Sequence, residues 1–380
     1  MCGWSAPVWL DQDGIDPSLF FDDDGSVYLT SNGWGVEHDL SGRIVIQQSR
    51  IEIETGRLLT PSRVISYGMG GRCAEAPHLY KINGMYYLLL AEGGTELGHM
   101  VTVFRSQSPW GPFEPGPSNP ILTAKDEGAP ELSGIGHGEL LEDTCGNWWM
   151  MFLCYRIATV KYHHLGRETG LVPIVWENGW PVPVGGRCPG IHMRIPELAG
   201  IAPNQTQEKF LDEFDKPDWN LEWNFIREFT DAYEINPLEK QLVLYGNEEN
   251  LSSQGAPGFV GRRQCHMEME FSAEIGFAPA GEHEEAGIAV ICSNRAHYDL
   301  GIRRVQGKRM VRLHKVVEDM EVCKEIEIEE TGKVTLSIRA DRENYYFCVI
   351  SQEGRNLLIG TGMTKLLSSE VIWGFTGVLV

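Results

Sequence analysis

Three stretches of the 380-residue chain repeat one another at a spacing of about sixty residues, and this repeat limits the folds that the chain can adopt. The stretches are Ile15-Asp16-Pro17-Ser18-Leu19, Glu75-Ala76-Pro77-His78-Leu79 and Gly136-His137-Gly138-Glu139-Leu140. Each is followed by a glycine and then by aromatic residues: Gly25 with Tyr28, Gly84 with Tyr86 and Tyr87, Gly146 with Trp148 and Trp149. A period in this range, with several short strands per unit, is typical of the blades of a β-propeller.

The repeat places ionisable residues at the same corner of each unit. Because the blades of a propeller converge on a central axis, Asp16, Glu75 and His137 are predicted to face one another across a pocket. A pair of carboxyl groups flanking a bond is the usual arrangement for glycoside hydrolysis. The general acid must keep its proton near neutral pH, which a second carboxylate nearby promotes by repulsion. The residues alone leave two alternatives open, a turn-forming Asp-Pro at Asp16 and a solvated loop residue at Glu75.

Composition narrows the choice of partners and of compartment. The 32 basic and 53 acidic residues give a net charge of −21, which argues against nucleic acid or an anionic membrane as a partner. No apolar run approaches the roughly 18 residues of a membrane span, and the start, Met1-Cys2-Gly3-Trp4, has no signal-peptide pattern. The nine cysteines are odd in number and include no Cys-x-x-Cys pair. This pattern is typical of a protein whose cysteines stay reduced. We therefore expect a cytoplasmic protein.

The pattern of apolar residues divides the chain into two all-β domains. Residues 1–195 alternate turn signals with short apolar runs, such as Tyr86–Leu90 and Trp148–Phe152, that are typical of strands buried on both faces. Residues 196–207 are rich in proline, glycine and polar residues and are predicted to be a linker. From there on apolar and polar residues alternate, as around Val334, Leu336 and Ile338, which predicts a β-sandwich over residues 208–380.

Three repeats are too few for a closed propeller, which typically has four to eight blades. We therefore expect residues 1–195 to form a partial propeller of about three blades, from a fragment or from a chain whose missing blades are supplied otherwise. An open arc exposes unpaired strand edges and apolar surface. This predicts self-association into a homo-oligomer or docking on a partner.

The longer motifs resemble one enzyme family. The run Gly14-Ile15-Asp16-Pro17-Ser18-Leu19-Phe20-Phe21-Asp22-Asp23-Asp24-Gly25 is similar to glycoside hydrolase family 43, which contains β-xylosidases and α-L-arabinofuranosidases. The resemblance continues, in family order, through residues 75–81, 91–95, 119–122, 136–140 and 165–169. The second domain resembles the concanavalin-like C-terminal domain of that family, with Trp223, Arg227 and residues 261–264 as markers.

This resemblance implies a five-bladed propeller that hydrolyses glycosides by inversion with three acids and requires no cofactor. It implies that Glu75 is the general acid and that Asp16 modulates the pKa of the acid and orients the sugar. It places His137 near the propeller centre, next to a water or a calcium ion, and it implies that Arg167 and Phe375 bind the sugar. Other interpretations stay open: a hydrogen-bonded core histidine at 137, an ion pair of Arg167 with a neighbouring acid, and a core aromatic at 375.

The third acid of the family, the base that activates water, has no matching segment here. Asp11 and Asp13 are too close to Asp16, because they belong to the same loop. We therefore expect the N-terminal blades to be missing and the activity to be impaired. That activity would be the removal of terminal xylosyl or arabinofuranosyl residues from xylo- or arabinoxylo-oligosaccharides. The alternatives are a non-catalytic sugar-binding protein and an invertase-like propeller, and the Ala-Pro-His-Leu-Tyr run after Glu75 counts against the latter.

The open arc leads to a first prediction about stability. We expect limited proteolysis to cut first before Pro196 and to leave a resistant core of about residues 208–380, because the sandwich can bury its core alone whereas the arc cannot. The fragments would be identified by mass spectrometry. A monodisperse monomer whose two halves resist proteolysis equally would contradict this expectation.

Overall fold

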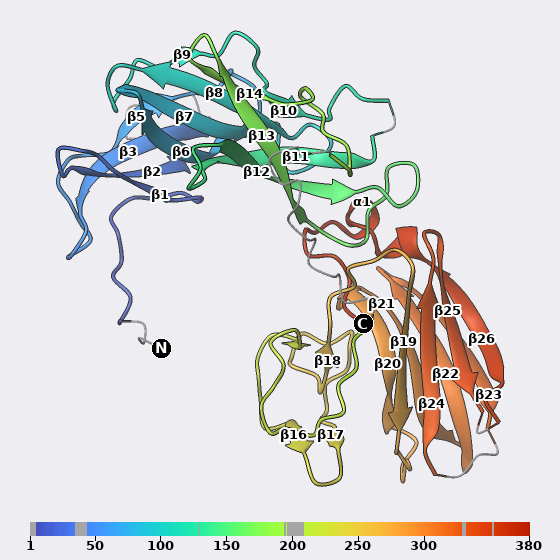
Figure 1. The fold of residues 1–380 in the computed structure, drawn as a ribbon. Helices are drawn as coiled ribbons and strands as arrows, with labels where there is room; N and C mark the ends of the chain where they lie inside the picture. The colour runs from blue at the N-terminus through green and yellow to red at the C-terminus, as the bar shows by residue number, and fades with distance from the viewer. Residues whose placement is uncertain are drawn as a thin grey trace. The chain divides into compact units, whose positions relative to one another are not determined.

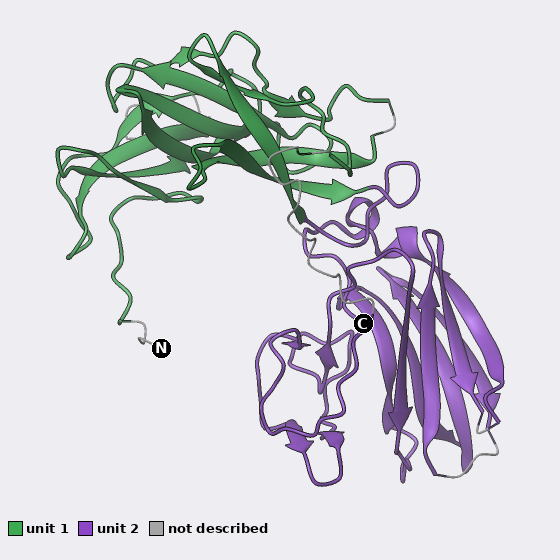
Figure 2. Cartoon of the chain, viewed as in Figure 1, with its two compact units in different colours: residues 1–156, 168–199 green, residues 157–167, 200–380 purple. Residues whose placement is uncertain are grey.

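The computed structural model describes residues 5–34, 44–128, 130–193, 195, 209–328, 332–351 and 353–380. The chain divides into two compact units, residues 1–156 with 168–199 and residues 157–167 with 200–380 (Figure 2). The predicted linker, residues 196–207, lies outside the described residues. The segment 157–167 belongs to the second unit, where the backbone N–H of Val378 donates to the carbonyl of His164 at 3.0 Å. The sequence did not predict this assignment.

The first unit contains three antiparallel sheets in its described part, one for each repeated stretch (Figure 1). The first sheet consists of β1 (Ser18–Phe21), β2 (Val27–Gly33), β3 (Val45–Glu52), β4 (Arg57–Leu58) and β5 (Arg63–Ser66). The second consists of β6 (Glu75–Ile82), β7 (Met85–Glu92), β8 (Met100–Ser106), β9 (Glu114–Pro115) and β10 (Leu122–Thr123). The third consists of β11 (Leu132–Glu142), β12 (Trp148–Arg156), β13 (Glu168–Glu177) and β14 (Trp180–Pro183). In each sheet the strand that carries the repeat, β1, β6 or β11, is an edge strand.

Strand β7 joins the three sheets into one stack. Its alternate residues point to opposite faces, as in any strand. Tyr87 and Leu89 pack in a core shared with the third sheet, whereas Leu88 and Leu90 pack in a core shared with Ile46 of the first sheet. The apolar run is therefore buried on both faces, as the sequence predicted, and the sheets pack face to face as the blades of a propeller do.

The corresponding strand of the third sheet behaves differently. Within β12, Met150 and Phe152 are buried in the core shared with the second sheet, but Met151 between them is 38% exposed. The expectation that the run Trp148–Phe152 is buried on both faces therefore holds only in part, because on the second face Trp149 is buried and Met151 is not. The described residues leave the other face of this strand partly open to solvent.

The second unit is a β-sandwich with a smaller strand-and-loop region in front of it in the sequence. One sheet of the sandwich has the order β19 (Met269–Ile275), β24 (Val334–Ala340), β25 (Asn344–Ile350), β26 (Asn356–Met363). The other has the order β20 (Glu285–Ser293), β21 (Ala296–Val305), β22 (Lys308–Val317), β23 (Met320–Glu327). The remaining elements are β15 (Asn224–Phe225), β16 (Tyr233–Asn236), β17 (Gln241–Leu244), β18 (Val260–Gly261), the 3₁₀ helix η2 (Thr364–Leu367) and α1 (Ser369–Ile372). Neither helix found among the described residues has the length and apolarity needed to cross a membrane.

The core of the sandwich follows the alternation seen in the sequence. Val334, Leu336 and Ile338 of β24 are each at most 1% exposed, and they pack against Leu300 and Leu313 of the opposite sheet. Their neighbours in the strand face outwards, as the period of two requires. The described regular elements are thus strands apart from two short helices, which confirms the prediction of an all-β chain.

The double burial of β7 leads to a prediction about the first unit. We expect Leu89→Ala to lower the stability of this unit by about 2–5 kcal/mol, because it removes a fully buried side chain from the core between two sheets. Leu97→Ala is the matched control, since Leu97 is 49% exposed and its loss should change stability by no more than about 0.5 kcal/mol. Thermal melts of both variants test this, and equal midpoints for the two variants would contradict it.

Candidate active site

The three repeated stretches share an unusual backbone conformation at one position. Asp16, Ala76 and His137 occupy equivalent places in the repeat, and their φ angles are 51°, 47° and 47°. Residues other than glycine seldom adopt positive φ. In the second and third sheets this residue lies within a break of strand register, between Glu75 and His78 and between Gly136 and Glu139. Such bulges re-aim side chains next to the strand edge.

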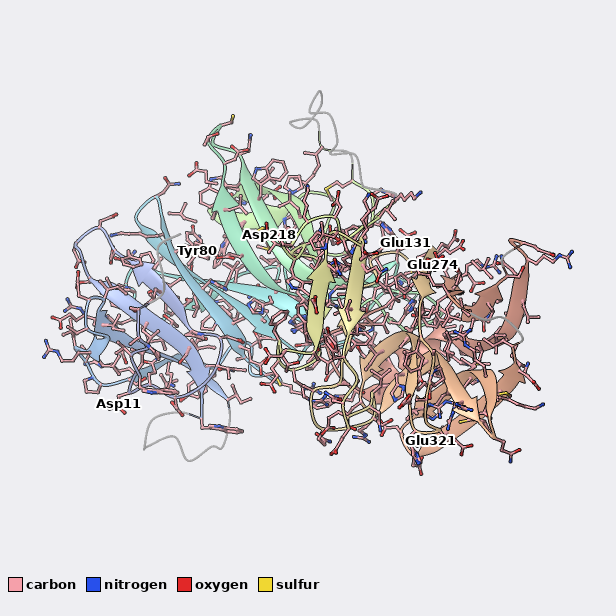
Figure 3. All side chains as sticks on the ribbon, turned by 90° about the horizontal axis from the view of Figure 1, so that it is seen from below. Asp11, Tyr80, Glu131, Asp218, Glu274 and Glu321 are labelled. Atoms are coloured by element: carbon pink, nitrogen blue, oxygen red, sulfur yellow. The ribbon has the colours of Figure 1, made fainter. Side chains whose placement is uncertain are left out.

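Asp16 connects the first sheet to the second at this position. Its Oδ2 atom accepts a hydrogen bond from the backbone N–H of Ala76 at 3.1 Å. Two residues further along, the hydroxyl of Ser18 donates to the carbonyl of Pro77 at 2.7 Å. The same relation recurs between the next two sheets, where the N–H of Leu140 donates to the Tyr80 hydroxyl at 3.0 Å (Tyr80 is labelled in Figure 3). These bonds fix the repeated corners against one another.

Glu75 begins β6 directly before the left-handed residue, and it is half-buried beside Asp16. Burial raises the pKa of its carboxyl above the ordinary value, and the negative charge of Asp16 raises it further. The guanidinium of Arg72 opposes this shift, but it is itself paired with Glu96 at 2.5 Å. A carboxyl in such a site holds its proton at higher pH than a solvated one, as a general acid requires.

His137 lies near the corner formed by Asp16 and Glu75, where its ring is next to that of His78. The side chain of His137 is exposed, so it is not the core histidine of the alternative interpretation. Its ring centroid lies 6.0 Å from that of His78. His78 Nδ1 lies 3.8 Å from Glu139 Oε1, and burial lowers the pKa of His78. The sequence reasoning missed His78, although the repeat gives a signal: it occupies the same position as Ser18 and Glu139.

A second buried carboxyl supports the loop before Glu75. Glu92 is 2% exposed, and its two oxygens accept hydrogen bonds from the N–H of Met69 at 3.1 and 3.0 Å. Its Oε1 atom also accepts from the hydroxyl of Thr102 at 2.6 Å. Burial raises the pKa of Glu92. This carboxyl anchors the loop that leads to Arg72 and Glu75.

Arg167 and Phe375, the two predicted sugar-binding residues, lie together in the second unit. The guanidinium carbon of Arg167 is 5.1 Å from the centroid of the Phe375 ring, a cation–π contact. Glu168 is not the partner of Arg167, because it accepts hydrogen bonds from Arg156 at 2.7 to 3.1 Å. Phe375 is half-buried next to Trp373, which is 78% exposed. The role of this pair in sugar binding stays a prediction.

The described contacts of His137 do not by themselves define a calcium site, and calcium at this position stays a prediction. Calcium takes six to eight oxygen ligands, whereas the described neighbours here are the imidazoles of His137 and His78 and the carboxylate of Glu139. The group of potential metal ligands that the described residues bring together lies in the second unit, at His297, Asp299 and His314.

The comparisons with known proteins agree with the fold. Residues 2–181 match the family described as glycosyl hydrolases family 43, and residues 211–380 match the β-xylosidase C-terminal concanavalin A-like domain. A non-reducing end α-L-arabinofuranosidase of Bacteroides ovatus is 36% identical over 99% of this chain and 70% of its own length. A xylosidase/arabinosidase of Butyrivibrio fibrisolvens is 34% identical over 84% of this chain and 63% of its own length. The chain belongs to glycosyl hydrolases family 43.

Solved structures confirm the predicted architecture. A Bacteroides ovatus protein described as xyloglucan PUL GH43B has a TM-score of 0.90 and 34% identity, covering 100% of this chain and 73% of that one. A xylan β-1,4-xylosidase of Bacillus halodurans has a TM-score of 0.90 and 30% identity, covering 99% and 74%. The chain thus combines β-propeller sheets with a concanavalin-like sandwich and spans between about 63% and 74% of these relatives.

The electrostatics of the site lead to a prediction that does not depend on activity. Asp16→Asn should lower the pKa of Glu75 towards its ordinary value, since it removes a like charge, whereas burial should keep part of the shift. Carbon-13 NMR of labelled glutamate carboxyls would follow the titration, with Glu75→Gln assigning the signal. Asp11→Asn, at an exposed residue of the preceding loop, is the control.

The same shift has a consequence for stability. Because the pKa of Glu75 is raised in the folded protein, the contribution of Glu75 to stability is complete at pH values below its ordinary pKa and is lost as the pH rises through the raised pKa.

In the NMR titration, an unchanged or higher pKa of Glu75 in Asp16→Asn would contradict the role given to Asp16.

Proposed function

We propose that this protein acts on xylan-derived oligosaccharides and removes terminal β-xylosyl or α-L-arabinofuranosyl residues by an inverting acid/base mechanism. The observation that carries the proposal is the half-buried carboxyl of Glu75 beside Asp16, with its pKa raised, at the repeated corner of a family 43 chain. Relatives named as xylosidases and arabinofuranosidases support the substrate class.

Each of the two acids has a separate task in this proposal. Glu75 protonates the departing glycosidic oxygen, because it is the carboxyl whose surroundings favour the protonated form. Asp16 accepts the hydrogen bond from the N–H of Ala76, which holds its carboxylate beside Glu75, and its negative charge raises the pKa of Glu75. In an inverting enzyme the acid and the base lie roughly 6.5–9.5 Å apart so that a water fits between the base and the sugar.

The base is the part of the mechanism to which no acid of this chain is assigned. No segment of the sequence matches the family's base motif. Among the described residues, two other acids near the site have partners, Glu96 with Arg72 and Glu139 with His78. We therefore propose that the 380-residue chain hydrolyses nitrophenyl xylosides and arabinofuranosides slowly, by a factor of about 10²–10⁴ relative to an enzyme with a base.

A binding protein without hydrolysis is the second candidate, because the site retains Asp16 and Glu75 but no assigned base. Calorimetric binding of xylobiose with no release of xylose over days would favour this candidate. Rapid turnover by the purified chain would instead contradict the proposed impairment and require a substitute base.

The role of Glu75 is tested by comparing leaving groups. Glu75→Gln should slow substrates with poor leaving groups, such as xylobiose, much more than activated nitrophenyl glycosides, because protonation matters most when the departing oxygen is basic. The matched control is Glu96→Gln, a nearby acid whose side chain is 50% exposed. The measurement is kcat/KM for both substrate types, in this chain or in a version extended to the length of its relatives. Equal slowing of both types would exclude Glu75 as the general acid.

A further inference from the structure

The sandwich carries a polar site on the outer face of the sheet β20–β23. Tyr298 and Leu300 of β21 and Leu313 of β22 point into the core, so the residues that alternate with them point to the opposite face. On that face lie two histidines and several charged residues. Figure 3 labels one of them, Glu321, on this sheet.

Three of these side chains converge on one point. Asp299 and His314 are direct partners across β21 and β22, and His297 precedes Asp299 by two residues on the same face. Asp299 Oδ1 lies 2.7 Å from His297 Nδ1, and Asp299 Oδ2 lies 3.4 Å from His314 Nδ1. One ligand atom from each of the three residues lies within 4.8 Å of the others. The side chains are 2%, 16% and 12% exposed in chain order.

The far nitrogen of each imidazole also has an oxygen partner. His297 Nε2 lies 2.9 Å from the Ser252 hydroxyl, and His314 Nε2 lies 3.5 Å from Glu321 Oε2. Both rings therefore present Nδ1 to the shared point and hold their other nitrogen against an oxygen. Metal-binding histidines have this arrangement, because the outer partner fixes the tautomer and the orientation of the ring.

The positive charge nearest to the point is already neutralised. Arg312 lies 3.8 Å from Asp299 Oδ2, but its guanidinium is paired with Glu285 at 2.5 and 3.1 Å. The shorter contacts of Asp299 are therefore those with the two imidazoles. Two imidazoles and a carboxylate suit zinc and neighbouring transition metals, whereas calcium and magnesium prefer oxygen ligands alone.

The order Ser252, His297, Asp299 also has the contacts of a serine hydrolase triad. Two features count against that function. The N–H of Ser252 donates to Asn250 Oδ1 at 2.9 Å, so this N–H is already hydrogen-bonded and does not serve as an oxyanion-hole donor. Asp299 is shared with a second imidazole, that of His314, which a triad does not require.

We propose that His297, Asp299 and His314 bind a divalent transition metal, with zinc as the best fit, and that solvent completes a tetrahedral site. The metal links strands β21 and β22 of the sandwich and has a structural role there. This site is independent of the proposed glycosidase function, because it uses residues of the second unit only.

The test measures bound metal in the full chain. Protein stripped with a chelator is dialysed against zinc, and bound zinc per chain is counted by atomic emission. Because free cysteines elsewhere also bind zinc, the result is the difference between variants. The unsubstituted chain and His266→Gln, a control at an exposed histidine of the same unit, should each bind one equivalent more than Asp299→Asn or His314→Gln.

Two further measurements distinguish the loss of a metal ligand from misfolding of a variant. Cobalt should give visible absorption bands in the unsubstituted chain that Asp299→Asn lacks, while circular dichroism reports that the variant is folded. Ser252→Ala, which keeps all three ligands, should weaken zinc binding about tenfold. Equal zinc content in all variants, or no cobalt bands in the unsubstituted chain, would overturn the proposal.

Discussion

The carboxylate of Asp16 accepts a hydrogen bond from the backbone N–H of Ala76 at 3.1 Å, across the boundary between the first and second sheets. Ala76 can make this contact because its φ of 47° and the break in strand register turn its N–H away from the strand partner. The adjacent Glu75 is thereby held beside Asp16, and burial and the neighbouring charge raise its pKa. One backbone irregularity, repeated at His137, therefore sets both the packing of the sheets and the chemistry of the site.

Much of the fold could be predicted because it depends on local patterns. The alternation around Leu336 identified the sandwich, and the continuous apolar run of β7 identified a strand between two cores. The placement of residues 157–167 could not be predicted, since it depends on contacts with residues some two hundred positions later. His163, for example, pairs with Glu370 at 2.6 Å. No local pattern reports such a contact.

Some residues of the candidate site could be predicted from the sequence, and others could not. Asp16 and Glu75 stand out because both lie at the corner that opens each repeat, one residue apart in its alignment, and because a glycosidase needs two acids. His78 was missed because its residue type differs from those at the equivalent positions, Ser18 and Glu139, so that the repeat hides its role. The contact of Arg167 with Phe375 and the convergence of His297, Asp299 and His314 both depend on strand pairing and loop placement. The resemblance named Arg167 and Phe375 but not their contact, and His297, Asp299 and His314 have no linear motif that single-sequence reasoning could use.

The hydrogen bond from Ala76 to Asp16 can be measured directly by amide hydrogen exchange. The account predicts that the Ala76 amide exchanges slowly in the unsubstituted chain and that Asp16→Ala removes this protection, while the amide of Leu88 in β7 keeps its own. Rapid exchange at Ala76 in the unsubstituted chain, or equal protection in Asp16→Ala, would contradict the claim that this contact organises the site.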